Sequence, residues 1–211
     1  MKSWIKQIGC FCLCMFGCLL SVEAQENQVY EIPFDKGTLL LTPLQDNAVR
    51  IRYVEGEMKE LPEWVYVQTD NNDIKCKRKD TKAGVSLKLK QMNVIVDQQA
   101  KLLTATDRDG NVVFKAKAHE LKAATVQQEP TRDATLVIES PADEYLYGLG
   151  QFQDGYLNVR GLTRRLTQVN TQIAIPFLLS NKGYGLLWNN YGLTNFNPAT
   201  GKPFTAKNGT E

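Results

Sequence analysis

The sequence of 211 residues contains a single histidine, His119, in a stretch rich in lysine and alanine. A two-histidine metal site cannot be assembled from one histidine, and the sequence offers no constellation for a Ser/His/Asp triad. These enzyme classes are therefore excluded. The remaining residues that could take part in catalysis or ligand binding are carboxylates and glycines in turns.

A carboxylate-rich turn, Asp107-Arg108-Asp109-Gly110-Asn111, is similar to a calcium-binding loop. With Asp107 and Asp109 as the third and fifth ligands, the first and twelfth positions fall on Ala105 and Ala116, so the bidentate acid is missing. Asp-Gly also supplies the positive backbone angles of a tight turn. We therefore expect a structural turn between two strands, within residues 101–115, and no metal.

A second motif, Gly148-Leu149-Gly150, is similar to part of a phosphate-binding loop. It lacks a third glycine and a following helical pattern, both of which a dinucleotide site requires. Glycines inside a strand pattern are typical of a bend or of a close approach to another backbone. We expect that structural role, and no cofactor.

The N-terminal residues have the anatomy of a secretory signal peptide. Lys2 and Lys6 precede an apolar segment over residues 8–20, and a small-residue site ends at Ala24. We expect cleavage after Ala24, which leaves residues 25–211 as one periplasmic or secreted domain with Cys76 as its single cysteine. A lipoprotein acylated at Cys18 is the alternative. The apolar segment is too short for a spanning helix, so no membrane span is expected.

The composition is that of an ordinary globular protein, with 43% hydrophobic residues and 25 Lys+Arg against 23 Asp+Glu. A net charge of +2 spread along the chain provides no basic stripe for phosphates. Nucleic acid is therefore not an expected partner.

From residue 28 onward, short runs rich in Val, Ile, Leu, Thr and Tyr recur about every ten residues between Gly, Asp, Asn and Pro, while helical periodicity is almost absent. The pattern predicts an all-β antiparallel sandwich. In 49–53, apolar residues alternate with arginines, which predicts one buried and one polar face. Residues 127–133 are expected to form a loop. The expected strands are 29–34, 38–42, 49–54, 65–69, 85–89, 93–97, 102–106, 112–116 and 135–139.

Three motifs in the last third of the chain carry a family resemblance. They are Tyr147-Gly148-Leu149-Gly150-Gln151, Ile175-Pro176-Phe177-Leu178-Leu179-Ser180, and Lys182-Gly183-Tyr184-Gly185-Leu186-Leu187-Trp188-Asn189-Asn190. In type and spacing they resemble the N-terminal galactose-mutarotase-like domain of glycoside hydrolase family 31, which includes α-glucosidases and α-xylosidases. Gln151 stands where many members have Glu. The resemblance is strong over residues 144–191 and looser over 28–139.

The resemblance implies a β-sandwich that precedes a (β/α)8 barrel. Retaining glycosidases use two carboxylates about 5 Å apart, and in this family both are barrel aspartates, which would lie beyond Glu211. The carboxylates here, Asp143, Glu144 and Asp154, form no pair that the sequence can identify. We therefore expect no catalytic residue and no activity in this chain alone. It is interpreted as a fragment of a secreted α-glycosidase, supporting the barrel and shaping its substrate entrance.

In the family, a sandwich loop between the first two motifs reaches over the barrel and contacts the bound sugar. The corresponding residues are 158–173, and the polar side chains there are Arg160, Arg164, Arg165, Gln168, Asn170, Thr171 and Gln172. We expect Asn170, Gln172 and Arg164 to bind the α-linked oligosaccharide; the alternative is that they are ordinary polar loop residues. The aromatic side chains able to stack on a sugar ring are Phe152, Tyr156, Trp188 and Tyr191.

Two other functions compete with the domain hypothesis. A stand-alone carbohydrate-binding module would show an exposed aromatic platform and no apolar docking face. A mutarotase-like epimerase would pair a carboxylate base with histidine acids, which a chain with only His119 cannot do. If the domain packs against a barrel, the isolated chain should expose a large apolar face and associate.

Overall fold

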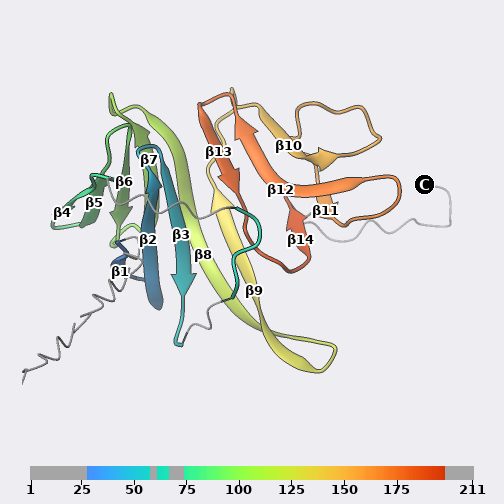
Figure 1. The fold of residues 1–211 in the computed structure, drawn as a ribbon, viewed down its shortest axis with the longest axis horizontal. Coiled ribbons are helices and arrows are strands. Elements are labelled where there is room, and N and C mark those ends of the chain that lie inside the picture. The colour runs from blue at the N-terminus through green and yellow to red at the C-terminus, as the bar shows by residue number, and fades with distance from the viewer. Residues whose placement is uncertain (1–27, 58–60, 67–73, 198–211) are drawn as a thin grey trace, which may run out of the picture.

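The computed structural model describes residues 28–57, 61–66 and 74–197, and these residues form fourteen strands and no helix. All strand pairs are antiparallel, so the expected fold class is confirmed. The strands (Figure 1) are β1 (Tyr30–Phe34), β2 (Gly37–Gln45), β3 (Ala48–Val54), β4 (Lys77–Asp80), β5 (Gly84–Lys88), β6 (Met92–Asp97), β7 (Leu102–Asp107), β8 (Val112–Val126), β9 (Glu129–Ile138), β10 (Leu146–Gln151), β11 (Arg164–Leu166), β12 (Ile173–Ser180), β13 (Tyr184–Leu187) and β14 (Thr194–Phe196).

The main core lies between a three-stranded sheet, β1-β2-β3, and a six-stranded meander, β4 to β9. Figure 1 shows β2 and β3 in front of the meander, running in roughly the same direction as β6 and β7. Alternate residues of β1 and β2, among them Ile32, Leu39 and Leu41, are fully buried against Leu87 and Leu103 of the meander. The period-two pattern of the sequence therefore builds the two-layered core that we predicted.

The β7–β8 connection is the turn that resembled a calcium loop. The Asp107 carboxylate accepts hydrogen bonds from the backbone N–H groups of Asp109 (2.9 Å) and Asn111 (2.8 Å) and from the Asn111 side-chain amide (2.9 Å). These hydrogen bonds, above all the one from the Asn111 amide, lower the pKa of Asp107. This carboxylate closes its own turn, as expected for a structural hairpin.

Several local expectations differ from the structure. Residues 127–133 are not a loop: Gln127 and Gln128 form a two-residue turn with φ of 50° and 69°, and β9 begins at Glu129. Strand β4 was not expected, because its four residues are charged. In β3 Val49 and Tyr53 pack against the main core, as expected for the apolar face, although Ile51 between them is 36% exposed. Of the expected strand 65–69, residues 65 and 66 form a bend and the rest lies outside the described residues.

The C-terminal third forms a second unit of two small sheets, β10-β12-β13 and β11-β14, around Leu146, Leu149, Val159 and Leu178. The rings of Phe114 on β8 and Tyr184 on β13 meet edge to face at 5.2 Å and connect this unit to the meander. The C-terminal unit contains the three family motifs and the loop over residues 158–173.

Gly148 and Gly150 have the structural role that the sequence predicted. Their φ angles are 112° and 102°, and the β10–β12 register shifts between them. A Cβ atom would lie 2.3 Å from the Phe177 carbonyl oxygen at Gly148, and 2.0 Å from the Ile173 carbonyl oxygen at Gly150. Only glycine allows β10 to bend and still pair with β12.

Within the described residues, no helix is long and apolar enough to cross a membrane. The N-terminal residues expected to be a signal peptide lie outside the described part of the chain.

Candidate functional site

A buried carboxylate, Glu144, fixes the start of β10 to the β12–β13 hairpin. Its side chain is 2% exposed, and its Oε1 accepts hydrogen bonds from Ser180 Oγ (2.6 Å) and Tyr184 Oη (2.8 Å). Burial and the neighbouring carboxylate raise the pKa of Tyr184 well above its ordinary value, so this hydroxyl stays protonated and donates. Glu144 Oε2 has no hydrogen-bond partner among the described residues.

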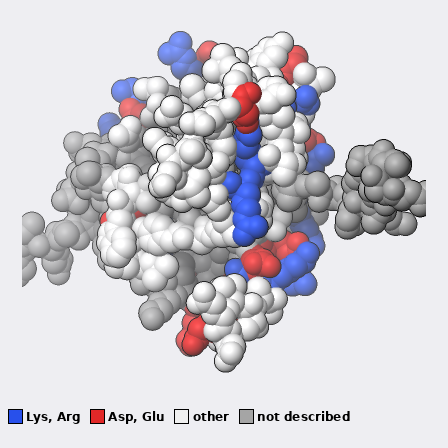
Figure 2. Space-filling model, turned by 90° about the vertical axis from the view of Figure 1, so that its right-hand side faces the viewer, with Lys and Arg blue, Asp and Glu red and all other residues white. Residues whose placement is uncertain are grey.

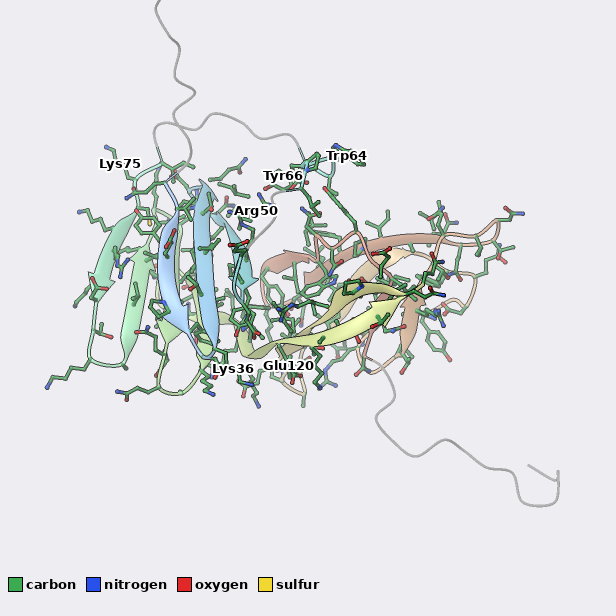
Figure 3. All side chains as sticks on the ribbon, turned by 90° about the horizontal axis from the view of Figure 1, so that it is seen from below. Lys36, Arg50, Trp64, Tyr66, Lys75 and Glu120 are labelled. Atoms are coloured by element: carbon green, nitrogen blue, oxygen red, sulfur yellow. The ribbon has the colours of Figure 1, made fainter. Side chains whose placement is uncertain are left out.

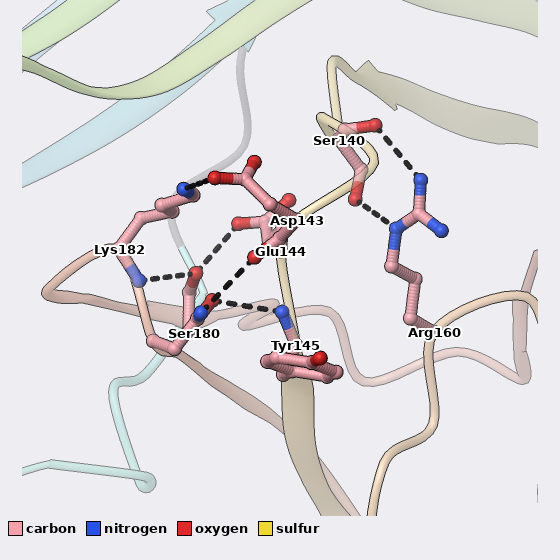
Figure 4. Close-up of polar contacts among 8 residues, drawn as sticks. Ser140, Asp143, Glu144, Tyr145, Arg160, Ser180 and Lys182 are labelled. Carbon is pink, nitrogen blue, oxygen red and sulfur yellow. Dashed lines mark hydrogen bonds and ion pairs between the residues drawn. The ribbon is translucent and has the colours of Figure 1, made fainter.

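The neighbours of Glu144 are engaged in the same connection (Figure 4). Lys182 Nζ lies 2.5 Å from Asp143 and lowers the pKa of that carboxyl. The Asn181 side chain accepts from Tyr145 N (2.8 Å) and donates to the Asp143 carbonyl (3.1 Å). Glu144 and the residues around it thus tie the start of β10 to the β12–β13 hairpin.

A hollow of about 530 Å³ lies beside this cluster, between β8 and the turn that leads into β10. Its wall includes Phe114 and Pro141 together with charges of both signs, Glu139, Asp143 and Lys182. Arg160 closes the neighbouring turn by donating to Ser140 Oγ (3.1 Å) and to the Ser140 carbonyl (3.2 Å). Arg160 is therefore a structural residue of the loop.

Arg164, one of the three predicted sugar-binding residues, points into its own loop. Its guanidinium forms an ion pair with Asp154 and lies 4.6 Å above the Phe152 ring, and the side chain is 14% exposed. Burial, the largest single influence, acts to raise the pKa of Asp154, but the hydrogen bonds from Arg164 and from the Tyr156 backbone, together with the charge of Arg164, outweigh it, and the pKa of Asp154 is lowered. Arg164 and Phe152 form one packed unit.

Gln172 is likewise turned inward, whereas Asn170 is not. Gln172 Nε2 donates to Thr167 O (2.8 Å) and Thr167 Oγ1 (3.1 Å), and Val169 pairs with Gln172 as an isolated bridge. Asn170 and Thr171 form the exposed tip of this hairpin. Gln172 and Arg164 shape a hairpin whose outermost amide is that of Asn170.

The predicted aromatic residues differ in exposure. Phe152 is half-buried under Arg164, and Trp188 is half-buried, its backbone N–H donating to Pro176 O (2.8 Å). Tyr156 is 63% exposed, and Tyr191 is 51% exposed and stacks on Trp64. Sequence reasoning misses Trp64, which directly precedes the expected strand 65–69. Its position two residues after Pro62 is the available signal that it lies outside a strand.

One face of β12 is apolar and half-exposed in the part of the chain that the structure describes. Its outward residues Ile173, Ile175, Phe177 and Leu179 are 45%, 49%, 40% and 51% exposed. Leu187, paired with Phe177 on β13, is also exposed. Figure 2 views the end of the molecule that carries β11, β12 and β14, and its surface is mostly uncharged, crossed by a narrow column of basic residues. We call Ile173, Ile175, Phe177, Leu179 and Leu187 the β12 face.

The model of the glycosyl hydrolase 31 N-terminal galactose mutarotase-like domain matches residues 38–197. The chain belongs to this family. The resemblance deduced from the three motifs is therefore confirmed, and the match extends through the main core to include β2 and β3.

Several relatives of this N-terminal domain are parts of larger proteins named as α-xylosidases. The α-xylosidase of Saccharolobus solfataricus is 31% identical over 160 residues, which is 71% of this chain and 22% of that protein. The crystal structure of a family 31 α-xylosidase from Xanthomonas citri superposes with a TM-score of 0.71 at 22% identity, over 79% of this chain and 19% of that one. A family 31 α-xylosidase from a soil metagenome, complexed with xylose, gives a TM-score of 0.67 at 23% identity, over 80% of this chain and 28% of that one. The chain thus spans about a fifth of the curated α-xylosidase that it matches.

Proposed function

We propose that this chain is the N-terminal domain of a secreted or periplasmic α-glycosidase, inactive alone, that packs against a catalytic barrel through the β12 face. The observation that carries the proposal is the row of half-exposed apolar side chains on β12. Exposed apolar surface of this kind is costly in water and marks a place where another surface docks.

The proposed role at the substrate entrance falls on the hairpin that ends at Asn170. Its exposed amide can both donate to and accept from sugar hydroxyls. Gln172 and Arg164 support the same site from within, because their hydrogen bonds and ion pair fix the base of the hairpin. A contact made by a rigid hairpin loses little conformational entropy on binding.

The proposed substrate of the whole enzyme is an α-linked oligosaccharide. Some relatives are named as α-xylosidases and another as a family 31 glucosidase, which together support an α-linked glycoside. Two barrel carboxylates would carry out hydrolysis with retention. In the proposed enzyme the reacting groups belong to the barrel.

The test is the oligomeric state of the chain by sedimentation velocity. The wild-type chain is expected to associate, and the double variant Ile175→Lys/Leu179→Lys to remain monomeric, because two charges on the β12 face oppose its burial. Val137→Lys is the matched control. Val137 on β9 is 44% exposed, a fraction similar to the 49% of Ile175, and it lies outside the β12 face. A wild-type chain that stays monomeric, or a control variant that dissociates equally well, contradicts the proposal.

A further inference from the structure

Trp64 is the most exposed of the large hydrophobic side chains that the structure describes, at 81%. Full burial of such a ring would be favourable by several kcal/mol on the area scale, at roughly 25 cal/mol per Å². An exposed indole on a firmly held backbone is therefore typical of a binding surface.

The backbone around Trp64 is held by Tyr191, 127 residues later in the chain. The Tyr191 hydroxyl accepts a hydrogen bond from Trp64 N (3.1 Å) and donates one to Pro62 O (2.8 Å). The two rings lie with centroids 6.2 Å apart and planes 21° from parallel. We call Trp64 and Tyr191 the aromatic platform.

The residue beside Trp64 supplies a buried anchor. The Glu63 side chain is 8% exposed; it pairs with Arg50 (3.3 Å) and accepts from Asn189 Nδ2 (2.8 Å). The segment is thus tied to β3 through Arg50 and to the chain after β13 through Asn189. Figure 3 shows Arg50 close to β3 and Trp64 at the outside of the molecule, with Tyr66 between them.

We propose that the aromatic platform is a binding site for the pyranose rings of a glycan chain in the gluco or xylo configuration. In these sugars all ring substituents can be equatorial, so both ring faces present C–H groups and stack flat on an aromatic ring. A rigid pair of rings offers this area with little loss of side-chain entropy. A galacto or manno ring carries an axial hydroxyl, which interrupts one face.

The platform is made of residues other than the hairpin at Asn170 and the β12 face. Its binding does not depend on a barrel, and the inference therefore goes beyond the proposed function. Two rings give a small contact, and the expected dissociation constant for an oligosaccharide is on the order of 1 mM.

The experiment is affinity electrophoresis of the full chain through native gels that contain hydroxyethylcellulose, a glucan, or a mannan. The wild-type chain is expected to be retarded by the glucan and much less by the mannan. Trp64→Ala should weaken glucan binding by roughly tenfold or more, which corresponds to about 1.4 kcal/mol. Trp64→Phe, which keeps a flat ring, should restore most of the retardation.

Two further variants separate ring contact from general effects. Tyr191→Phe keeps the ring and removes the hydroxyl that holds residues 62–64, and should weaken binding by roughly two- to fivefold. Val126→Ala, at an exposed apolar position on the distant β8–β9 turn, should change nothing. The proposal is overturned if the wild-type chain is not retarded, if Trp64→Ala binds the glucan as well as wild type does, or if Trp64→Ala changes only self-association.

Discussion

The Ser180 hydroxyl donates a 2.6 Å hydrogen bond to the Glu144 carboxylate, and both residues are buried, at 5% and 2% exposure. The same hydroxyl accepts from Lys182 N at 3.0 Å. This contact joins Glu144, three residues before the Tyr-Gly-Leu-Gly-Gln motif, to Ser180, the last residue of the Pro-Phe motif. A buried hydrogen bond thus links the regions of the two motifs in the folded chain.

Ser180→Ala should lower the free energy of unfolding by about 1–3 kcal/mol, since it leaves a buried carboxylate short of a donor. Urea unfolding followed by tryptophan fluorescence measures the change. Asp143→Asn is the matched control, because the Asp143 side chain is 75% exposed and its pair with Lys182 is on the surface. Equal stability of Ser180→Ala and wild type would contradict a structural role for the contact.

Gly150→Ala should destabilise the chain by about 3 kcal/mol or more, because it combines strain at a positive φ with a clash against a backbone oxygen. Gly155→Ala separates the two causes. Gly155 has a φ of 75° and nothing within 4 Å of its would-be Cβ, so only the strain remains there. Its cost should be about 1–2 kcal/mol. Thermal unfolding of both variants provides the comparison, and similar losses at the two sites would argue against the clash.

Stability should fall as the pH decreases through the range in which the unfolded His119 takes up a proton. Burial against Phe34 (5.6 Å between ring centroids) and Tyr53 (6.1 Å) lowers the pKa of His119 below its ordinary value of 6.5. Below about pH 6.5 the unfolded chain binds the proton more readily than the folded chain, so folding is opposed.

Unfolding free energies between about pH 7.5 and 5.5 isolate this effect, since carboxylates titrate at lower pH. His119→Phe keeps an aromatic ring in the cluster and removes the titrating group. That variant should lose the decrease in this range, and a decrease that persists in it would assign the effect to other groups.

Asn170→Ala, made in a full-length enzyme that contains this domain, should raise KM for an oligosaccharide by roughly three- to tenfold through loss of one or two hydrogen bonds. Its melting temperature should equal that of wild type, because the side chain is exposed. Arg164→Ala should instead lower stability by about 2 kcal/mol through the lost contact with Phe152. An unchanged KM for Asn170→Ala would remove Asn170 from the substrate entrance.

The sequence predicted the fold class, eight of the nine expected strands and the role of Gly148 and Gly150, because side-chain alternation and turn residues are local signals. The expected ranges do not include β4, whose charged residues show no alternation and which forms by backbone pairing with β5, and they do not include β10 to β14 of the C-terminal unit. The Arg164 side chain points into its own loop because it contacts Asp154 and Phe152 there. The position of Trp64 depends on its hydrogen bond with Tyr191. A local sequence pattern predicts neither the packing of side chains nor a contact between residues more than a hundred positions apart.

Strand β4 has a consequence for the behaviour of the free chain. It forms one outer edge of the six-stranded sheet, and all four of its side chains, Lys77, Arg78, Lys79 and Asp80, are exposed. Three consecutive positive charges repel the same strand of another molecule. Pairing of another strand with the unpaired backbone groups at this edge is therefore disfavoured. Clusters of the chain should therefore be compact and reversible and not fibrillar, and they should dissolve when the β12 face is charged.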